Sequence, residues 1–160
     1  MTTSHADDLW DSVRVFGSRP PSVIAVVRPS AYAVIRNDQG EFAVVKAPDG
    51  VFLPGGGIAP GESPEQAVGR EALEECGFTL RLGRRVAHAI QLAESVSEKA
   101  FFEKQCTFFE ASVVAQGSPT EPGHELIWSS PAHAASLLSH ESHRWVVGVV
   151  DSMATKTLTR

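Results

Sequence analysis

The hydrophobic residues in the first third of the chain fall into short β-branched runs that are separated by turn-forming residues. Residues 23–27 and 31–36 are two such runs, and residues 37–40 form a polar turn before a returning run at 41–46. β-branched runs between clusters of Gly, Pro, Asn and Asp are typical of strands. The pattern predicts strands over these ranges, with the last two joined as a hairpin.

A helix is predicted at residues 64–76, because both of its ends carry capping signals. Ser63 is the expected N-cap, Pro64 the first helical residue and Gln66 the partner in a capping box. Gly77 supplies a left-handed terminus.

The second half of the chain continues the alternation of strands and helices. We expect a short strand at 51–53, long strands at 79–92 and 104–114 around a polar connection at 94–99, a loop at 117–123, a short strand at 126–128, a helix at 131–138 and a last helix at 142–153. The last helix places Trp145, Val149 and Met153 on one face, although residues 146–150 also have the composition of a strand. The alternation predicts an α/β fold with a mixed sheet flanked by helices.

The first 21 residues show no clear periodicity and end in Arg19-Pro20-Pro21, although Trp10 and Phe16 are able to pack. We expect residues 1–21 to be an N-terminal arm, either loosely ordered or used as a dimerisation extension. Residues 22–160 are expected to form a single domain, which a chain of 160 residues accommodates.

Composition narrows the classes of partner and the compartment. The formal net charge of −5 argues against broad nucleic-acid binding, which requires a basic surface. Cys76 and Cys106 fit no zinc or redox spacing and are expected to be free thiols. No apolar segment approaches the ~20 residues that span a bilayer, and the first ten residues do not resemble a signal peptide. These features predict a cytoplasmic protein without a membrane partner.

Three acids on the predicted helix share one side of it. Glu71, Glu74 and Glu75 fall within an arc of about 100°, since residues three and four apart are neighbours on a helix. A solvated surface is the ordinary alternative, but these acids border the apolar stripe of Val68 and Ala72. Crowded carboxylates beside a core raise one another's pKa unless a cation neutralises them. Oxygen ligands without His or Cys on this face favour Mg²⁺, with Mn²⁺ as a substitute.

The spacing Gly56-x5-Glu62-x7-Arg70-Glu71-Ala72-x-Glu74-Glu75-x-Gly77-Phe78 resembles the signature of the Nudix hydrolases, G-x5-E-x7-R-E-U-x-E-E-x-G-U, in which U is a bulky apolar residue. The small Ala72 is the one soft departure. The resemblance covers roughly residues 22–150 and implies an α/β/α sandwich with a mixed sheet, and it favours a helix at the C-terminus. It also implies Mg²⁺-dependent hydrolysis of a phosphoanhydride in a nucleoside diphosphate linked to another group.

The resemblance implies roles for residues of the signature. Glu74 and Glu75 match the principal metal ligands, the Gly55 carbonyl matches a further oxygen ligand, and Glu71 matches a ligand or general base. Glu62 and Arg70 match a salt-bridge lattice that holds the glycine-rich loop to the helix, and so they are expected to support the site rather than to touch substrate.

The general base varies among Nudix enzymes, and a Glu on a later loop is the alternative to the signature. Glu125, just ahead of Trp128, is our preferred candidate on that loop, and Glu121 is the second.

Substrate contacts carry no comparable signature. Arg28, Lys46 and Lys104 are candidates for substrate phosphates and Phe52 for stacking on a base, with surface charge and core packing as the alternatives. The histidines share no metal-ligand spacing and are expected to be surface or capping residues: His88, His124, His133, His140 and His143.

A pyrophosphohydrolase of nucleoside triphosphates, including oxidised ones, is the preferred activity, because the chain is compact and residues 142–145 resemble the last helix of small triphosphate-cleaving members. The nearest alternative is a hydrolase of ADP-ribose, nucleotide sugars or dinucleotides, for which residues 1–21 would supply a dimerisation strand. A ligand sensor without catalysis is disfavoured by the intact acids, and cleavage of RNA 5′ ends by the acidic composition. The family also suggests a homodimer.

Overall fold

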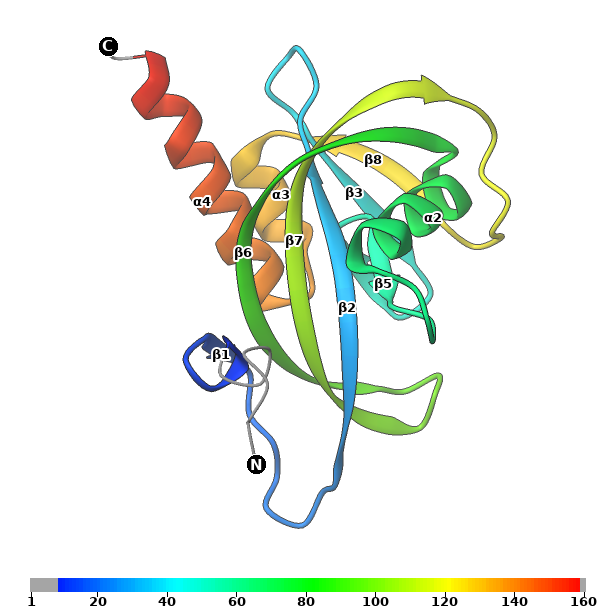
Figure 1. Cartoon of the computed structure of the whole chain (residues 1–160), viewed down its shortest axis with the longest axis vertical. Helices are drawn as coiled ribbons and strands as arrows, with labels where there is room; N and C mark the ends of the chain where they lie inside the picture. The colour runs from blue at the N-terminus through cyan, green and yellow to red at the C-terminus, as the bar shows by residue number, and fades with distance from the viewer. Residues whose placement is uncertain (1–8, 159–160) are drawn as a thin grey trace.

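The chain folds into two β-sheets with helices on opposite sides. The computed structural model describes residues 9–158. The elements, in chain order, are β1 (Arg14–Phe16), β2 (Ala25–Ile35), β3 (Phe42–Ala47), β4 (Gly50–Phe52), β5 (Gly55–Gly57), α2 (Pro64–Cys76), β6 (Phe78–Ser95), β7 (Ala100–Gln116), β8 (Glu125–Ser129), α3 (Pro131–Leu137) and α4 (Glu141–Leu158). The larger sheet has the mixed order β1-β6-β7-β2-β5, and the smaller, β4-β3-β8, is antiparallel. In Figure 1, α2 lies on one side and α3 with α4 on the other.

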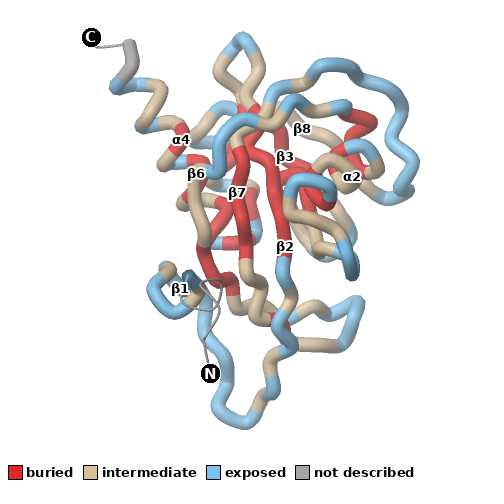
Figure 2. Tube along the Cα trace, in the orientation of Figure 1, coloured by how far each residue is buried: buried red, intermediate tan, exposed pale blue. Residues whose placement is uncertain are grey.

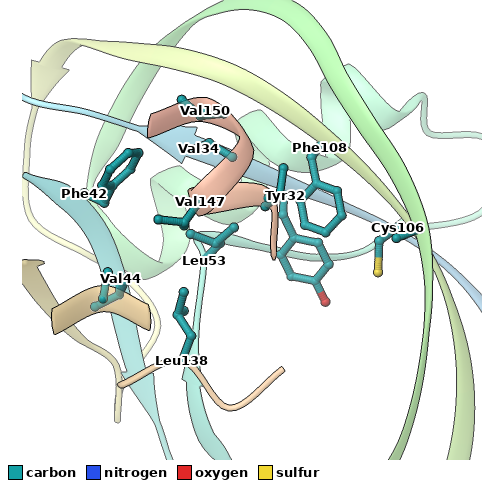
Figure 3. Packing of buried hydrophobic residues seen from close by; sticks show 13 residues of the cluster. Tyr32, Val34, Phe42, Val44, Leu53, Cys106, Phe108, Leu138, Val147 and Val150 are labelled. Atoms are coloured by element: carbon teal, nitrogen blue, oxygen red, sulfur yellow. The ribbon is translucent and has the colours of Figure 1, made fainter. Parts of the chain in front are cut away.

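Two hydrophobic clusters fill the space between the helices and the sheets. Side chains of β2 alternate between them, as the two faces of a strand require. Tyr32 and Val34 enter the cluster that contains residues of α3 and α4, whereas Ala33 and Ile35 enter the cluster that contains residues of α2. Figure 2 shows the buried middle of β2, β6 and β7, and Figure 3 shows the packing of the first cluster. The predicted α/β/α sandwich with a mixed sheet is confirmed.

The helix that carries the acids has the predicted bounds and caps. The Ser63 hydroxyl accepts a hydrogen bond from the Gln66 N–H at 3.1 Å, and the Gln66 side chain accepts one from the Ser63 N–H at 2.9 Å. Gly77 adopts a left-handed conformation with φ of 71° and ends the helix. The register of the acids on α2 is therefore set by local sequence.

Strand β2 is continuous where the sequence pattern predicted two runs, at 23–27 and 31–36. It pairs in parallel with β7 from Ala25 to Ile35. Pro29 does not interrupt it, because β5 pairs with β2 only from Ser30 onward and the strand has a single strand neighbour at the proline. Long-range pairing therefore overrides the local signal of a break.

Residues 14–16, which belong to the expected N-terminal arm, are attached to the larger sheet. They form β1, which pairs in parallel with β6 through Arg14 opposite Ala89 and Phe16 opposite Gln91. The Phe16 ring lies 5.5 Å from the ring of Trp145 on α4. This packing anchors the segment to both the sheet and the last helix, whereas residues 1–8 of the expected arm lie outside the described part of the chain.

The last helix is confirmed, but its buried face differs from the predicted one. Val146, Val147 and Val150 are buried, whereas Trp145 and Val149 are only partly covered. A four-residue spacing fits both the predicted stripe that contains Trp145 and Val149 and the stripe that contains Val146 and Val150. The second stripe is the one that enters the hydrophobic cluster.

Cys76 and Cys106 are free and buried, as expected. Burial raises the pKa of each thiol to about 12, so both remain protonated at neutral pH. Within residues 9–158, no helix has the length and apolar character needed to cross a membrane.

Candidate functional site

The glycines of β5 bring a backbone segment against the acidic face of α2. Gly55 has φ of 146°, and a Cβ there would collide with the backbone of Ala31 and Tyr32. A Cβ on Gly56 would lie 2.8 Å from Oε1 of Glu71. Gly55 therefore requires glycine for its backbone conformation and for its close approach to β2, whereas a Cβ on Gly56 would displace the Glu71 carboxylate.

Glu75 is the most buried acid of the site, with 8% of its side chain exposed. Its Oε1 accepts a hydrogen bond of 2.9 Å from the Gly55 N–H. Burial raises the pKa of this carboxyl to about 8; the Gly55 N–H opposes the rise, and the nearby acids, Glu71 first among them, add to it. A charged Glu75 is therefore unfavourable here without a compensating cation.

The loop that follows β7 delivers a fourth acid. The N–H groups of Thr120 and Glu121 donate to the Glu74 carbonyl at 3.0 and 2.9 Å, and the Gly117 N–H donates to the Gly77 carbonyl at 2.8 Å. The last carbonyls of a helix have no partner within the helix, so this loop satisfies them. One carboxylate oxygen each of Glu71, Glu74 and Glu121 then lie within 4.8 Å of one another.

Arg70 links the acids of α2 to the glycine-rich loop. Its Nε lies 2.8 Å from Glu62 Oε2, and its Nη1 lies 3.0 Å from Glu71 Oε1 and 3.3 Å from Glu74 Oε2. Its Nη2 donates to the Gly57 carbonyl at 3.2 Å. The hydrogen bonds from Arg70 lower the pKa of Glu62 to about 2. The geometry agrees with the expected lattice of Glu62 and Arg70.

His124 belongs to the acidic cluster, although its sequence context indicated a surface or capping residue. Its Nε2 lies 3.6 Å from Glu75 Oε2, and one donor atom each of Glu75, Glu121 and His124 lie within 4.8 Å of one another. No spacing within the signature points to His124, because the loop reaches α2 through backbone hydrogen bonds. Its place three residues after Glu121 is the one signal that was available.

A cavity of about 670 Å³ extends from the acids to an aromatic and cationic end. Phe52, Lys104 and His140 line that end, with the Lys104 Nζ 3.1 Å from His140 Nε2 and 5.6 Å from the centre of the Phe52 ring. Burial, followed by the charges of Lys104 and Arg144, lowers the pKa of His140 to about 3. Neutral His140 therefore accepts a hydrogen bond from the Lys104 ammonium group.

Arg28 also lines the cavity, but its charge is paired. Its two terminal nitrogens donate to Glu98 at 2.9 and 2.8 Å, and its guanidinium lies 3.8 Å from the centre of the Phe102 ring. Three of the four expected substrate contacts, namely Arg28, Phe52 and Lys104, thus share one cavity with Glu71 and Glu75.

Two expected site residues lie elsewhere. Glu125 is exposed at the start of β8 and pairs in register with Lys46 of β3, which is also exposed. Neither residue lines the cavity or belongs to the groups of possible metal ligands among the described residues. The loop turns back into a strand at Glu125, so the geometry favours Glu121 over Glu125 as the loop acid and removes Lys46 from the substrate contacts.

Comparison with known proteins supports the same assignment of family. The model of the NUDIX domain matches residues 26–147. A Bacillus subtilis (strain 168) protein named "Putative 8-oxo-dGTP diphosphatase" is 31% identical over 106 residues, which are 63% of this chain and 65% of that protein. The match therefore spans less than two thirds of that relative's length.

Solved structures share the fold. The MutT protein from Methanosarcina mazei Go1 is 24% identical with a TM-score of 0.64, over 84% of this chain and 99% of that chain. An Ap4A hydrolase from C. elegans is 20% identical with a TM-score of 0.65, over 81% of this chain and 98% of that chain. Because the family match covers most of the sequence and the folds agree, the chain belongs to the NUDIX family, whose hydrolases act on phosphoanhydrides of nucleoside diphosphate derivatives and generally use a divalent metal.

Proposed function

We propose that the protein is a Mg²⁺-dependent pyrophosphohydrolase of nucleoside triphosphates, oxidised ones included, and that it releases a nucleoside monophosphate and pyrophosphate. The observation that carries the proposal is that acids of the carboxylate cluster line the same cavity as Phe52 and Lys104. Its volume of about 670 Å³ falls within the range of small-ligand pockets. The 31% identical relative, named for 8-oxo-dGTP, supports the same substrate class.

The donor set suits the divalent metal that the family uses. Glu71, Glu74, Glu75 and Glu121 bring carboxylate oxygens together, and burial first, with the neighbouring acids second, raises the pKa of Glu75, so a cation would favour its charged form. We assign these four acids, with the Gly55 carbonyl, as the residues that hold the metal. Oxygen donors of this kind suit Mg²⁺, and Mn²⁺ substitutes for it. When bound, the ion neutralises substrate phosphates and lowers the pKa of water.

The protein's own residues position the reacting groups. Arg70 holds Glu71 and Glu74 in place and ties them to the Gly57 carbonyl, so the acids do not have to reorganise when phosphates arrive. Glu71 and Glu121 are the candidates for the base that takes a proton from the attacking water. Burial is the main cause that raises the pKa of Glu71, which moves this carboxyl towards the range suited to proton transfer.

The far end of the cavity suits the nucleoside. The Phe52 ring offers a face for stacking, and Lys104 offers ammonium donors to acceptor atoms of the substrate. Arg28 is held by Glu98, so it presents a guanidinium of fixed orientation rather than a mobile charge.

The dinucleotide alternative drew on the N-terminal arm as a strand for dimerisation. Residues 14–16 pair with β6 of the same chain, so one side of this short strand is already used within the chain. The homodimer and the cytoplasmic location remain predictions from the family and the composition, to be checked by light scattering and by cell fractionation.

The test is a Mg²⁺-dependent screen of nucleoside triphosphates, dinucleotides and nucleotide sugars with identification of the products. We expect pyrophosphate and a monophosphate from triphosphates. Loss of an acid that binds metal is expected to lower kcat by at least ~10²-fold in Glu74→Gln and Glu75→Gln. Release of a sugar phosphate with no triphosphate turnover would reject the substrate, and equal turnover in the variants would reject the site.

A further inference from the structure

His124 faces a carboxylate oxygen that has no hydrogen bond. Glu75 uses Oε1 for the Gly55 N–H, and its Oε2 receives no hydrogen bond from any of the residues that the structure describes. This oxygen points to Nε2 of His124, 3.6 Å away, and 14% of the His124 side chain is exposed. A carboxylate buried to this degree normally has partners for both oxygens. The contact therefore marks a place for a further group between Glu75 and His124.

The other ring nitrogen of His124 defines which proton the imidazole carries. Nδ1 lies 3.2 Å from the Pro122 carbonyl, which only accepts, so Nδ1 carries the hydrogen. In the neutral imidazole, Nε2 then presents its lone pair to Glu75. This lone pair is the ligand atom that a neutral histidine offers to a metal ion. A backbone carbonyl on the second nitrogen is also the usual support of a metal-binding histidine.

The distance between the two atoms distinguishes a shared ion from a direct ion pair. A charge-assisted hydrogen bond between imidazolium and carboxylate would be about 2.7–2.9 Å long, shorter than the 3.6 Å observed. Two ligands each about 2.1 Å from one tetrahedral ion are separated by roughly 3.4 Å. Glu121 completes the group, with one donor atom of each residue within 4.8 Å of the others.

We propose that His124 supplies a nitrogen ligand, with Glu75 and Glu121, to a transition-metal position of the site. The position adjoins the all-oxygen group of Glu71, Glu74 and Glu121 and shares Glu121 with it, and it also uses Glu75, which is assigned above to the metal-binding acids. Imidazole favours Mn²⁺, Co²⁺ or Zn²⁺ over Mg²⁺, which keeps to oxygen ligands. The inference rests on the proposed function only in that the same acids hold metal.

The test measures metal binding directly on the full chain. Mn²⁺ bound to the parent protein is expected to show ¹⁴N coupling in pulsed EPR, and this coupling should vanish in His124→Ala. Titration with Co²⁺ is expected to show at least ~10-fold weaker binding in His124→Ala, whereas Mg²⁺ affinity should change by less than about threefold. His133→Ala, which removes an exposed imidazole on α3, is the matched control and should behave as the parent.

Several outcomes separate this inference from the proposed function. Bound Mn²⁺ without ¹⁴N coupling, or equal Co²⁺ affinity in the parent and His124→Ala, would overturn the nitrogen ligand while leaving the Mg²⁺-dependent activity intact. Nitrogen coupling that is lost in His124→Ala would support it even if the triphosphate screen failed. A second variant, His124→Gln, replaces the imidazole by a side chain with an oxygen donor; Mn²⁺ bound without ¹⁴N coupling would again support the inference, and persistent ¹⁴N coupling would overturn it.

Discussion

The N–H of Gly55 donates a 2.9 Å hydrogen bond to Oε1 of Glu75, and so joins strand β5 to the last turn of α2. The bond leaves the other oxygen of Glu75 to face Glu121 and His124. It also orients a carboxyl whose burial favours the neutral form. The same contact therefore holds the loop in place and directs one oxygen of Glu75 towards the site.

The stability of the metal-free protein is expected to fall as pH rises, because of Glu75. Burial and neighbouring acids raise its pKa from 4.5 to about 8, so the folded state binds more protons than the unfolded state between these values. The free energy of unfolding should decrease over this range by at most about 1.4 kcal/mol per pH unit. Denaturant unfolding with a chelator, at several pH values from 5 to 8, measures the slope. Glu75→Gln, which keeps an acceptor for the Gly55 N–H, should have the shallower slope, and equal slopes would contradict the assignment.

Close approach at Gly56 is expected to control activity. In Gly56→Ala the new Cβ would lie 2.8 Å from Glu71 Oε1, so the Glu71 carboxylate must shift. Since a misplacement of about 1 Å in an active site can lower the rate by about 10²-fold, we expect kcat of Gly56→Ala to fall by up to this factor. Gly69 lies on α2, the helix that carries Glu71, and a Cβ there meets nothing within 4 Å. Gly69→Ala should therefore stabilise the protein by about 0.5–1 kcal/mol without loss of kcat. Steady-state kinetics and thermal unfolding of both variants separate the two effects, and a fully active Gly56→Ala would refute the steric argument.

The acids on α2 were predictable because one local element holds them. Helix periodicity and the caps at Ser63 and Gly77 suffice to place Glu71 and Glu75 on one face. Glu121 and His124 arrive through the tertiary structure, because the loop docks on the end of α2 by backbone hydrogen bonds that any residue type can make. The family resemblance indicated Glu121 only as the second candidate, and the place of His124 three residues later was the one further signal.

The errors in the fold have the same physical origin. The residue pattern predicted two separate runs, at 23–27 and 31–36, yet pairing with β7 makes β2 continuous from Ala25 to Ile35. Residues 14–16 show no periodicity of their own, and their parallel pairing with β6 depends on residues more than seventy positions away. Long-range pairing in a sheet is invisible to patterns within one segment.

Lys104 is expected to act in substrate binding rather than in the chemical step. It lines the cavity beside Phe52 and His140. Lys104→Met keeps the aliphatic volume and removes the charge, so KM for the preferred nucleotide should rise by about tenfold with little change in kcat. Lys46→Met removes an exposed lysine outside the cavity and should leave both constants unchanged. A drop in kcat at constant KM would place Lys104 in the chemistry instead.

Glu121 and Glu125 provide a matched pair for the role of the loop acid. Glu121 lies with Glu71, Glu74 and Glu75 in the groups of donor atoms, whereas Glu125 is exposed on β8 opposite Lys46. Loss of a general base or a metal ligand should lower kcat by about 10²–10⁴-fold in Glu121→Gln. Glu125→Gln should remain within about twofold of the parent, as a surface substitution away from the site does. The two variants have the same change in charge four residues apart, so net electrostatics cannot explain a difference between them. Initial rates with saturating Mg²⁺ decide the matter: a larger loss in Glu125→Gln than in Glu121→Gln would show that the loop rearranges when substrate binds and would restore Glu125 as the base.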